Sequence, residues 1–240
     1  MALTHIEKLI AKAILDYELI QPGDRILLGA SGGKDSTTLA WALGRRKKWN
    51  APAFELSALR IASDVPGGGM GSAAAQRLAA LYEEWGIPLH TLEVPIVERL
   101  KPGQRMNCYW CSTQRRTELL RYAMDKGCNK IALGHHLDDV LATLLMNMTK
   151  KGELATMPPR LKYDKYPVEI IRPLVLVSEE SIRSFAQEMG WLQITCTCGY
   201  GDDGERKEYQ RRLDVLTAGS VEAKRLMLKS LSNIKEGYLA

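Results

Sequence analysis

Apolar residues recur at two different periods along the chain, and the change of period separates helices from strands. In residues 4–18 the apolar positions follow the period of an amphipathic helix, with Thr4 at its N-cap. Residues 54–61 instead alternate between apolar and polar side chains, as in a half-buried strand. The same reasoning predicts strands at about 26–30, 89–95, 130–134 and 169–177, and helices at 37–48, 72–85, 114–126, from about 138 and from 179.

This alternation predicts an α/β fold with a doubly wound parallel sheet of about five strands. We expect an N-terminal helix at 1–20 and one domain at 21–200. The charged stretch at 201–240, with spaced Leu, Val and Met, is predicted to be a helical tail.

A glycine-rich hexapeptide, Ser31-Gly32-Gly33-Lys34-Asp35-Ser36, joins the first predicted strand to the following helix. Adjacent glycines let the backbone approach a ligand closely, and the N-terminus of a helix favours an anion. The lysine and the two serines add a positive charge and hydroxyl donors, which a plain turn would not need. It is not a Walker A loop, because Leu28 stands at the first glycine position and Asp35 follows the lysine. The segment resembles the pyrophosphate loop of ATP-pyrophosphatases, which cleave ATP between its α and β phosphates.

A second polar motif, Gly134-His135-His136-Leu137-Asp138-Asp139, follows the fourth predicted strand, where a parallel sheet binds its ligands. Two carboxylates beside two imidazoles suit Mg²⁺ binding and proton transfer. The alternative is that the two aspartates merely begin a helix, a position that favours acids. The independent phosphate loop favours the functional interpretation.

Four of the five cysteines occur in two close pairs, Cys108 with Cys111 and Cys196 with Cys198. Such pairs are typical of a tetrahedral zinc site, of an iron–sulfur cluster with an open iron, or of a redox dithiol. The spacing leaves zinc and iron–sulfur open. Cys128 stands apart, and we expect it to be structural.

Composition narrows the class of protein. The chain is 45% hydrophobic and 25% charged, as in a globular domain, and no apolar run is long enough to span a membrane. Charged residues occur early, at Glu7 and Lys8, so we expect no signal peptide. An odd number of clustered cysteines indicates an intracellular protein rather than a disulfide framework, so we expect a cytoplasmic enzyme. A net charge of +5 is compatible with a nucleic-acid partner.

The motifs together resemble the tRNA 2-thiocytidine synthetases, a PP-loop family of cluster-dependent tRNA thiolases. The resemblance rests on the hexapeptide, C-x-x-C at 108–111, G-H-H-x-D-D at 134–139, Met157-Pro158-Pro159 and the cysteine pair before Gly199, and it covers about residues 6–200. It implies an enzyme that adenylates C2–O of an anticodon-loop cytidine and then replaces the oxygen with sulfur, releasing AMP and pyrophosphate.

The resemblance also implies roles for individual residues. Cys108, Cys111 and Cys198, with Cys196 as the alternative, would ligate a 4Fe–4S cluster. Asp138 and Asp139 would handle ATP and Mg²⁺ and act in catalysis. Cys108 and Cys111 would also be catalytic. ATP would be bound by residues 31–36 with Gly134 and His135. The implied partners are tRNA, a sulfur donor such as a cysteine desulfurase, and a second copy in a homodimer.

Three segments depart from the family pattern. The late cysteines form C-x-C instead of C-x-x-C, the run after Cys111 is Ser112-Thr113-Gln114-Arg115-Arg116, and residues 200–203 are acidic. A diverged paralog that thiolates another base or a small molecule, or a nucleotide-binding zinc or redox protein without turnover, is therefore kept as an alternative. The candidate RNA contacts are Arg45–Lys48, Arg115, Arg116, Arg121, Lys150, Lys151, Arg160 and Lys162, with Tyr109 and Trp110 available to stack on a base.

Overall fold

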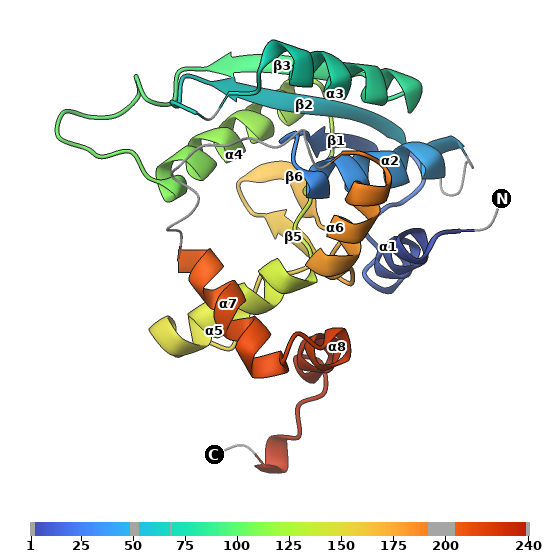
Figure 1. Ribbon diagram of the computed structural model, residues 1–240, viewed down its shortest axis with the longest axis vertical. Helices are drawn as coiled ribbons and strands as arrows, with labels where there is room; N and C mark the ends of the chain where they lie inside the picture. Colours follow the sequence, from blue (N-terminus) through green and yellow to red (C-terminus); the bar gives the residue numbers. More distant parts are fainter. Residues whose placement is uncertain (1–2, 49–52, 68, 192–204, 239–240) are drawn as a thin grey trace.

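The chain folds around a parallel sheet with strand order β3-β2-β1-β4-β6-β5 (Figure 1). The computed structural model describes residues 3–48, 53–67, 69–191 and 205–238. Five of the six strands in these residues run parallel, and β5 pairs antiparallel with β6. This confirms the predicted α/β fold. The strands are β1 (Arg25–Gly29), β2 (Glu55–Ser63), β3 (Leu89–Val94), β4 (Lys130–Ala132), β5 (Arg160–Tyr163) and β6 (Tyr166–Ile171).

Two differences from the predicted strands lie at one end of the sheet. The pattern did not indicate β5, because this strand is only four residues long and two of them are cations. The strand predicted at 169–177 instead ends at Ile171, and Val175 N–H bonds back to the Arg172 carbonyl in a turn. Pro173 explains the early end, since proline has no N–H to continue a ladder.

The helices follow the predicted amphipathic segments, but two of them begin earlier than predicted: α2 begins at Lys34 instead of 37, and α4 also starts early. Thr4 caps α1 as predicted, and its hydroxyl accepts from Glu7 N–H. Helix α4 begins at Cys108 rather than near 114, because the Asn107 side chain caps it by accepting from Trp110 N–H at 2.8 Å. The helices are α1 (His5–Asp16), α2 (Lys34–Lys48), α3 (Ser72–Glu84), α4 (Cys108–Asp125), α5 (Leu137–Lys151), α6 (Glu179–Glu188), α7 (Glu205–Thr217) and α8 (Val221–Ser230).

Alternate residues of the central strands face two apolar layers. On one face, Leu27, Leu59 and Ile131 pack against the α4 residues Leu120 and Ala123. On the other face a larger cluster joins the sheet to α1, α2, α3 and α6. This period of two is what a sheet covered on both faces requires.

The chain order of the strands reverses direction between β1 and β4. β2 and β3 lie to one side of β1, whereas β4 and β6 lie to the other. The segments that follow β1 and β4 therefore diverge and leave a crevice between them at the carboxyl edge of the sheet, where doubly wound folds bind ligands.

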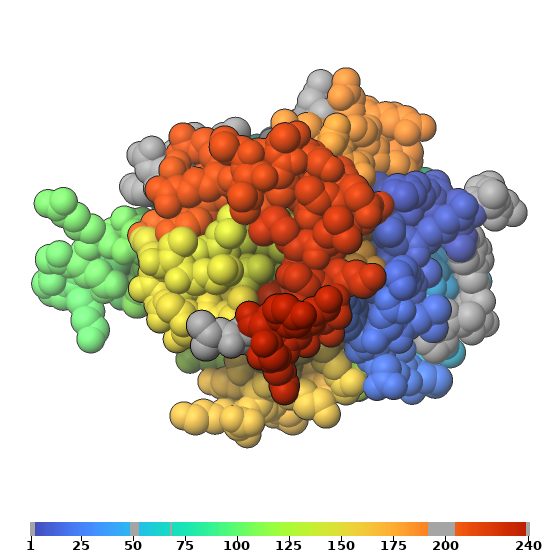
Figure 2. All heavy atoms as spheres, turned by 90° about the horizontal axis from the view of Figure 1, so that it is seen from below, coloured from blue at the N-terminus to red at the C-terminus, as the bar shows by residue number. Residues whose placement is uncertain are grey.

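Helices α7 and α8 pack against α5. Leu213 of α7 is buried against Leu137, Leu141 and Leu144 of α5. Figure 2 shows these C-terminal helices, in orange and red, lying across α5, in yellow, and beside the N-terminal segment, in blue. The division into 1–20, 21–200 and 201–240 stays a prediction. No helix in the described ranges is both long and apolar enough to cross a membrane.

Candidate active site

The hexapeptide forms a closed turn between β1 and α2. Ser31 Oγ lies 2.9 Å from Ser36 Oγ and accepts from Gly33 N–H at 3.2 Å. Ser36 Oγ also lies 3.1 Å from the Gly33 carbonyl oxygen, to which it can donate. Gly32 has φ of +79°, a conformation that a residue with a side chain rarely adopts. The sequence thus fixes a turn that leads directly into the N-terminus of α2.

Gly134 brings the second motif against this turn. A Cβ at Gly134 would lie 3.0 Å from Ser36 N and 3.1 Å from the carbonyl carbon of Asp35. These contacts are with backbone, which cannot move aside as a flexible side chain could. A glycine is therefore needed here for the two predicted ligand loops to touch.

A cavity of about 270 Å³ opens between the two loops. Ser31, Asp35, Ser36, His135 and Asp139 form its polar side, and Arg115 reaches it from α4. Its other wall is apolar and consists of Leu59, Ile61, Leu119 and Leu133. The cavity therefore combines an apolar wall suited to a base with a polar side formed by a phosphate-type loop.

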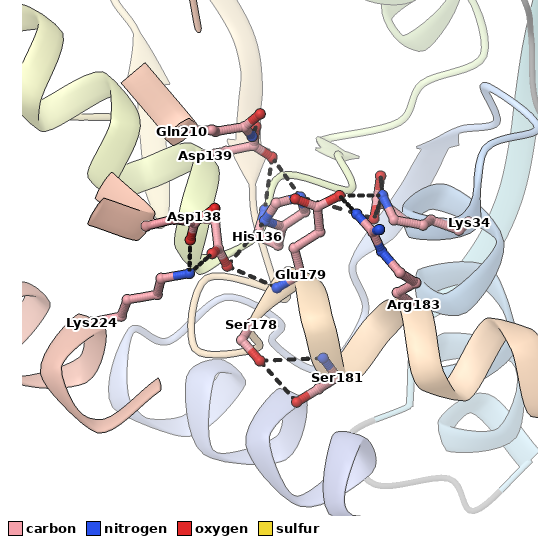
Figure 3. Close-up of polar contacts among 12 residues, drawn as sticks. Lys34, His136, Asp138, Asp139, Ser178, Glu179, Ser181, Arg183, Gln210 and Lys224 are labelled. Carbon is pink, nitrogen blue, oxygen red and sulfur yellow. Dashed lines mark hydrogen bonds and ion pairs between the residues drawn. The ribbon is translucent and has the colours of Figure 1, made fainter. Parts of the chain in front are cut away.

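Lys34 is held at the start of α2 by two carboxylates. Its Nζ lies 3.1 Å from Asp35 Oδ1 and 3.1 Å from Glu179 Oε1 (Figure 3). Burial works to lower the pKa of Lys34, but the two carboxylates outweigh it, so the pKa lies above its usual value. Lys34 is therefore charged at neutral pH and can exchange a carboxylate for a phosphate oxygen.

The two adjacent aspartates point in different directions. Asp138 is buried and is not among the residues that line the cavity in the described part of the chain. Its Oδ2 accepts from Glu179 N–H at 2.7 Å, and its Oδ1 accepts from Lys224 Nζ at 2.6 Å. Asp139 does line the cavity, and its Oδ1 accepts from Gln210 Nε2 at 3.3 Å (Figure 3). The structure therefore brings Asp139, but not Asp138, to the phosphate loop.

The two histidines also differ. Burial lowers the pKa of His135 to about 4, so this cavity-lining imidazole is neutral at pH 7. Its Nδ1 is buried and has no hydrogen-bond partner among the described residues, which leaves it for a ligand. His136 Nε2 instead lies 3.3 Å from Asp139 Oδ2, and His136 N–H donates to the same oxygen. His136 thus orients the carboxylate that faces the cavity.

The first cysteine pair lies in the first turn of α4. Cys108 is exposed and Cys111 is half-buried. Together with Arg115 they are spaced at i, i+3 and i+7, so they share the helix face that reaches the cavity. Two thiols one helical turn apart fit two ligands of an iron–sulfur cluster or zinc ion.

The predicted third ligand, Cys198 or Cys196, lies outside the described residues. In the described ranges, no three His, Cys, Asp or Glu side chains gather to hold a metal ion. The cluster ligand set and the Mg²⁺ site stay predictions.

The two aromatics between these cysteines have different environments. Tyr109 is 81% exposed. Trp110 packs against Ile96, and its indole N–H donates to the Ile96 carbonyl at 3.2 Å. Of the two, Tyr109 is the one available to stack on a base.

Several cations predicted to contact RNA are engaged in ion pairs within the protein. Arg116, by contrast, is exposed and makes no ion pair among the described residues. Arg115 lines the cavity and donates to Ser63 Oγ at 3.2 Å. The paired cations are Arg45 with Glu7, Arg121 with Glu118, Lys150 with Glu205, and Arg160 and Lys162 with Glu169.

Sequence reasoning missed three residues that contact the second motif or Lys34. Glu179 was indicated only as a favourable acid in the first turn of a helix. Gln210 and Lys224 stand in the charged stretch at the C-terminal end, where nothing in the pattern separates them from solvated side chains. They reach the site because α7 and α8 pack against α5.

Comparison of the sequence with known proteins identifies the family of the chain. The PP-loop domain family matches residues 2–194. The tRNA-cytidine(32) 2-sulfurtransferase of Geobacter sulfurreducens is 36% identical, with 98% of this chain and 91% of the relative covered. The enzyme of the same name from Anaeromyxobacter sp. (strain K) is 35% identical, with 95% and 78% covered.

Two solved structures share the fold. The U34-tRNA thiolase NcsA from Methanococcus maripaludis, solved with its [4Fe-4S] cluster, superposes with a TM-score of 0.72 at 24% identity and covers 98% of this chain and 82% of its own. The NH3-dependent NAD synthetase from Campylobacter jejuni gives 0.51 at 12% identity, with 95% and 92% covered. The fold, the paired loops and the sequence identity to the bacterial enzymes agree, and the chain belongs to the PP-loop family of tRNA 2-thiocytidine synthetases.

Proposed function

We propose that this protein is an ATP-dependent tRNA sulfurtransferase that converts a cytidine of the anticodon loop to 2-thiocytidine. The observation that carries the proposal is a cavity lined by the phosphate loop and Asp139 and, from α4, by Arg115, which follows Cys108 and Cys111 at helical spacing. The sequence relatives, which are tRNA-cytidine(32) 2-sulfurtransferases by name, support the choice of substrate.

The phosphate loop and Lys34 would hold the triphosphate of ATP, with the adenine against the apolar wall. In the first step the cytidine O2 attacks the α-phosphorus, and pyrophosphate leaves with the electron pair of the broken P–O bond. The Lys34 ammonium and the N-terminus of α2 stabilise the charge on the departing pyrophosphate.

Asp139, which lines the cavity, would be the carboxylate that holds Mg²⁺, since Mg²⁺ at nucleotide sites is commonly held by one or two carboxylates together with phosphate oxygens. His135, neutral at pH 7 and with Nδ1 unpartnered among the described residues, can hydrogen-bond a reacting group without adding charge.

In the second step a hydrosulfide attacks C2, AMP leaves with the former O2, and a proton is lost to give the thiocarbonyl. No electrons are gained or lost, so the sulfur must arrive at the level of sulfide. A sulfide source can supply it directly, whereas the persulfide of a cysteine desulfurase needs a thiol reductant that takes up the other sulfur in a disulfide and releases hydrosulfide. A 4Fe–4S group held by Cys108, Cys111 and Cys198 or Cys196 would supply that sulfur at a protected site. The homodimer and the cytoplasmic location stay predictions.

Nucleoside mass spectrometry of tRNA tests the proposal in cells that lack their own 2-thiocytidine enzyme. The intact gene should restore 2-thiocytidine, whereas Cys108→Ala should not. Cys128→Ala is the matched control. This thiol lies just before β4, at the amino end of that strand, whereas the candidate site lies at the carboxyl edge of the sheet. Absence of any thiolated nucleoside, from iron-loaded protein, would favour the diverged paralog. A colourless protein with one zinc that binds ATP without turnover would favour the nucleotide-binding alternative.

A further inference from the structure

Helix α8 inserts a buried lysine behind the second motif. Lys224 is 6% exposed, and its Nζ lies 2.6 Å from Asp138 Oδ1 and 2.6 Å from Asp214 Oδ1 (Figure 3). Burial works to lower the pKa of Lys224, but the two carboxylates raise it above the usual value, so the side chain is charged. A charge this deeply buried is tolerated only when it is paired, and removal of one partner is strongly destabilising.

Asp138 connects Lys224 to residues that contact the phosphate loop. Its second oxygen accepts from the backbone N–H of Glu179 at 2.7 Å, which fixes the first residue of α6. The Glu179 carboxylate in turn lies 3.1 Å from Lys34 Nζ. We call Lys224, Asp138, Glu179 and Lys34 the Lys224 network, and Figure 3 shows it running from α8 through α5 and α6 to α2.

The network explains why the motif contains two aspartates with one facing the cavity. Adjacent residues on a helix point about 100° apart, so Asp138 and Asp139 cannot serve the same ligand from an unbent α5. Asp139 lines the cavity, whereas Asp138 is buried behind it and accepts from Glu179 N–H and Lys224 Nζ.

We propose that Lys224 and Asp138 are positioning residues for ATP, which hold the start of α6 so that Glu179 sets the location of the Lys34 ammonium. The inference rests on the proposed function only in taking ATP as the nucleotide. Helix α8 lies beyond the region matched by the PP-loop family, and the proposal connects it to the phosphate loop through the contacts of the Lys224 network.

Calorimetric titration of the full chain with ATP tests this assignment without requiring turnover. Lys224→Met, which keeps length but removes the charge, should weaken the ATP Kd by roughly five- to tenfold, a usual size for coupling between linked groups. Lys224→Arg keeps the charge and should restore most of the affinity. Lys229→Met, an exposed lysine on the same helix, should leave the Kd unchanged. The Kd for tRNA should not change in any of the three.

A double-mutant cycle separates the network from a general loss of structure. Glu179→Gln keeps the backbone N–H that Asp138 accepts from but cuts the ion pair with Lys34. In that background, Lys224→Met should change the ATP Kd by less than about twofold, because the link is already broken. If Lys224→Met fails to fold, Asp138→Asn replaces it, since the amide oxygen can still accept from Glu179 N–H.

Two results would overturn the proposal. Independent, multiplicative effects of Lys224→Met and Glu179→Gln on the Kd would mean that the residues do not act through one another. A wild-type Kd in Lys224→Met beside loss of ATP binding in Asp138→Asn would mean that Asp138 contacts the nucleotide directly. Failure of the proposed function would give a different result. The wild-type protein would bind ATP but would form no AMP when tRNA is added.

Discussion

Gly134 lies against the backbone of Ser36, so that a Cβ at position 134 would stand 3.0 Å from the Ser36 amide nitrogen. Gly134→Ala should therefore push the two loops apart. Overpacking of this kind costs about 1–3 kcal/mol, which corresponds to a roughly 5- to 150-fold weaker ATP Kd if the strain is relieved by opening the site. Gly237→Ala is the control, because a Cβ there meets no atom within 4 Å. Equal ATP affinity of both variants would contradict the close approach.

His135 should make the stability of the protein depend on pH. Its pKa is about 4 in the folded protein against 6.5 for an ordinary histidine. As the pH falls, the imidazole therefore becomes protonated in the unfolded protein before it does in the folded protein. The stabilisation is fully present above pH 6.5 and is lost as the pH falls toward 4, at about 1.4 kcal/mol per pH unit in the middle of that window.

Denaturant unfolding at pH 7, 6 and 5 measures this effect. The wild-type protein should lose about 1–2 kcal/mol more than His135→Gln between pH 7 and pH 5. The prediction is wrong if His135→Gln and the wild type show parallel curves.

Tyr109 and Trp110 should respond oppositely to truncation. Tyr109→Ala should weaken tRNA binding about fivefold or more without changing Tm, because base stacking contributes about 1–3 kcal/mol and the side chain is exposed. Tyr109→Phe should retain the affinity. Trp110→Ala should instead lower the free energy of unfolding by about 2–3 kcal/mol, since its packing and its bond to Ile96 are lost. Filter binding and thermal unfolding distinguish the two outcomes.

Arg116 should contribute to the salt dependence of tRNA binding. Replacement of one phosphate-contacting cation lowers the slope of log Kd against log salt concentration by about one. Arg116→Gln should show this decrease. Arg121→Gln, whose guanidinium already lies 3.0 Å from Glu118, should leave the slope unchanged. An unaltered slope in Arg116→Gln would remove this residue from the RNA-binding surface.

The sequence was sufficient to predict the parts of the site that lie at strand ends. Ser31 and Gly134 each follow a parallel strand, and such strands end at one edge, so their proximity followed from the pattern of elements. The start of α4 was misplaced because Asn107 was not recognised as an N-cap. Its side chain ends the preceding segment and brings Cys108 into the helix.

The contacts made by Lys224 could not be read from the sequence. The contact with Asp138 joins positions 86 residues apart, and it depends on how α7 and α8 pack against α5. The different roles of Asp138 and Asp139, by contrast, carried a signal that was overlooked. Adjacent helical residues point in different directions, so a pair of neighbouring aspartates at a helix start already predicts one that faces the ligand and one that faces the protein.

The short strand β5 lies at one edge of the sheet and takes no part in the site. An uncovered edge strand offers free N–H and C=O groups to any other strand, and this is a common route to aggregation. Here the edge is four residues long, it carries Arg160 and Lys162, and it contains a break in register at Tyr163. The short pairing length and the break in register oppose the addition of a strand from a second copy. The strand that the sequence pattern did not indicate therefore makes this edge of the sheet a poor template for a strand from a second copy.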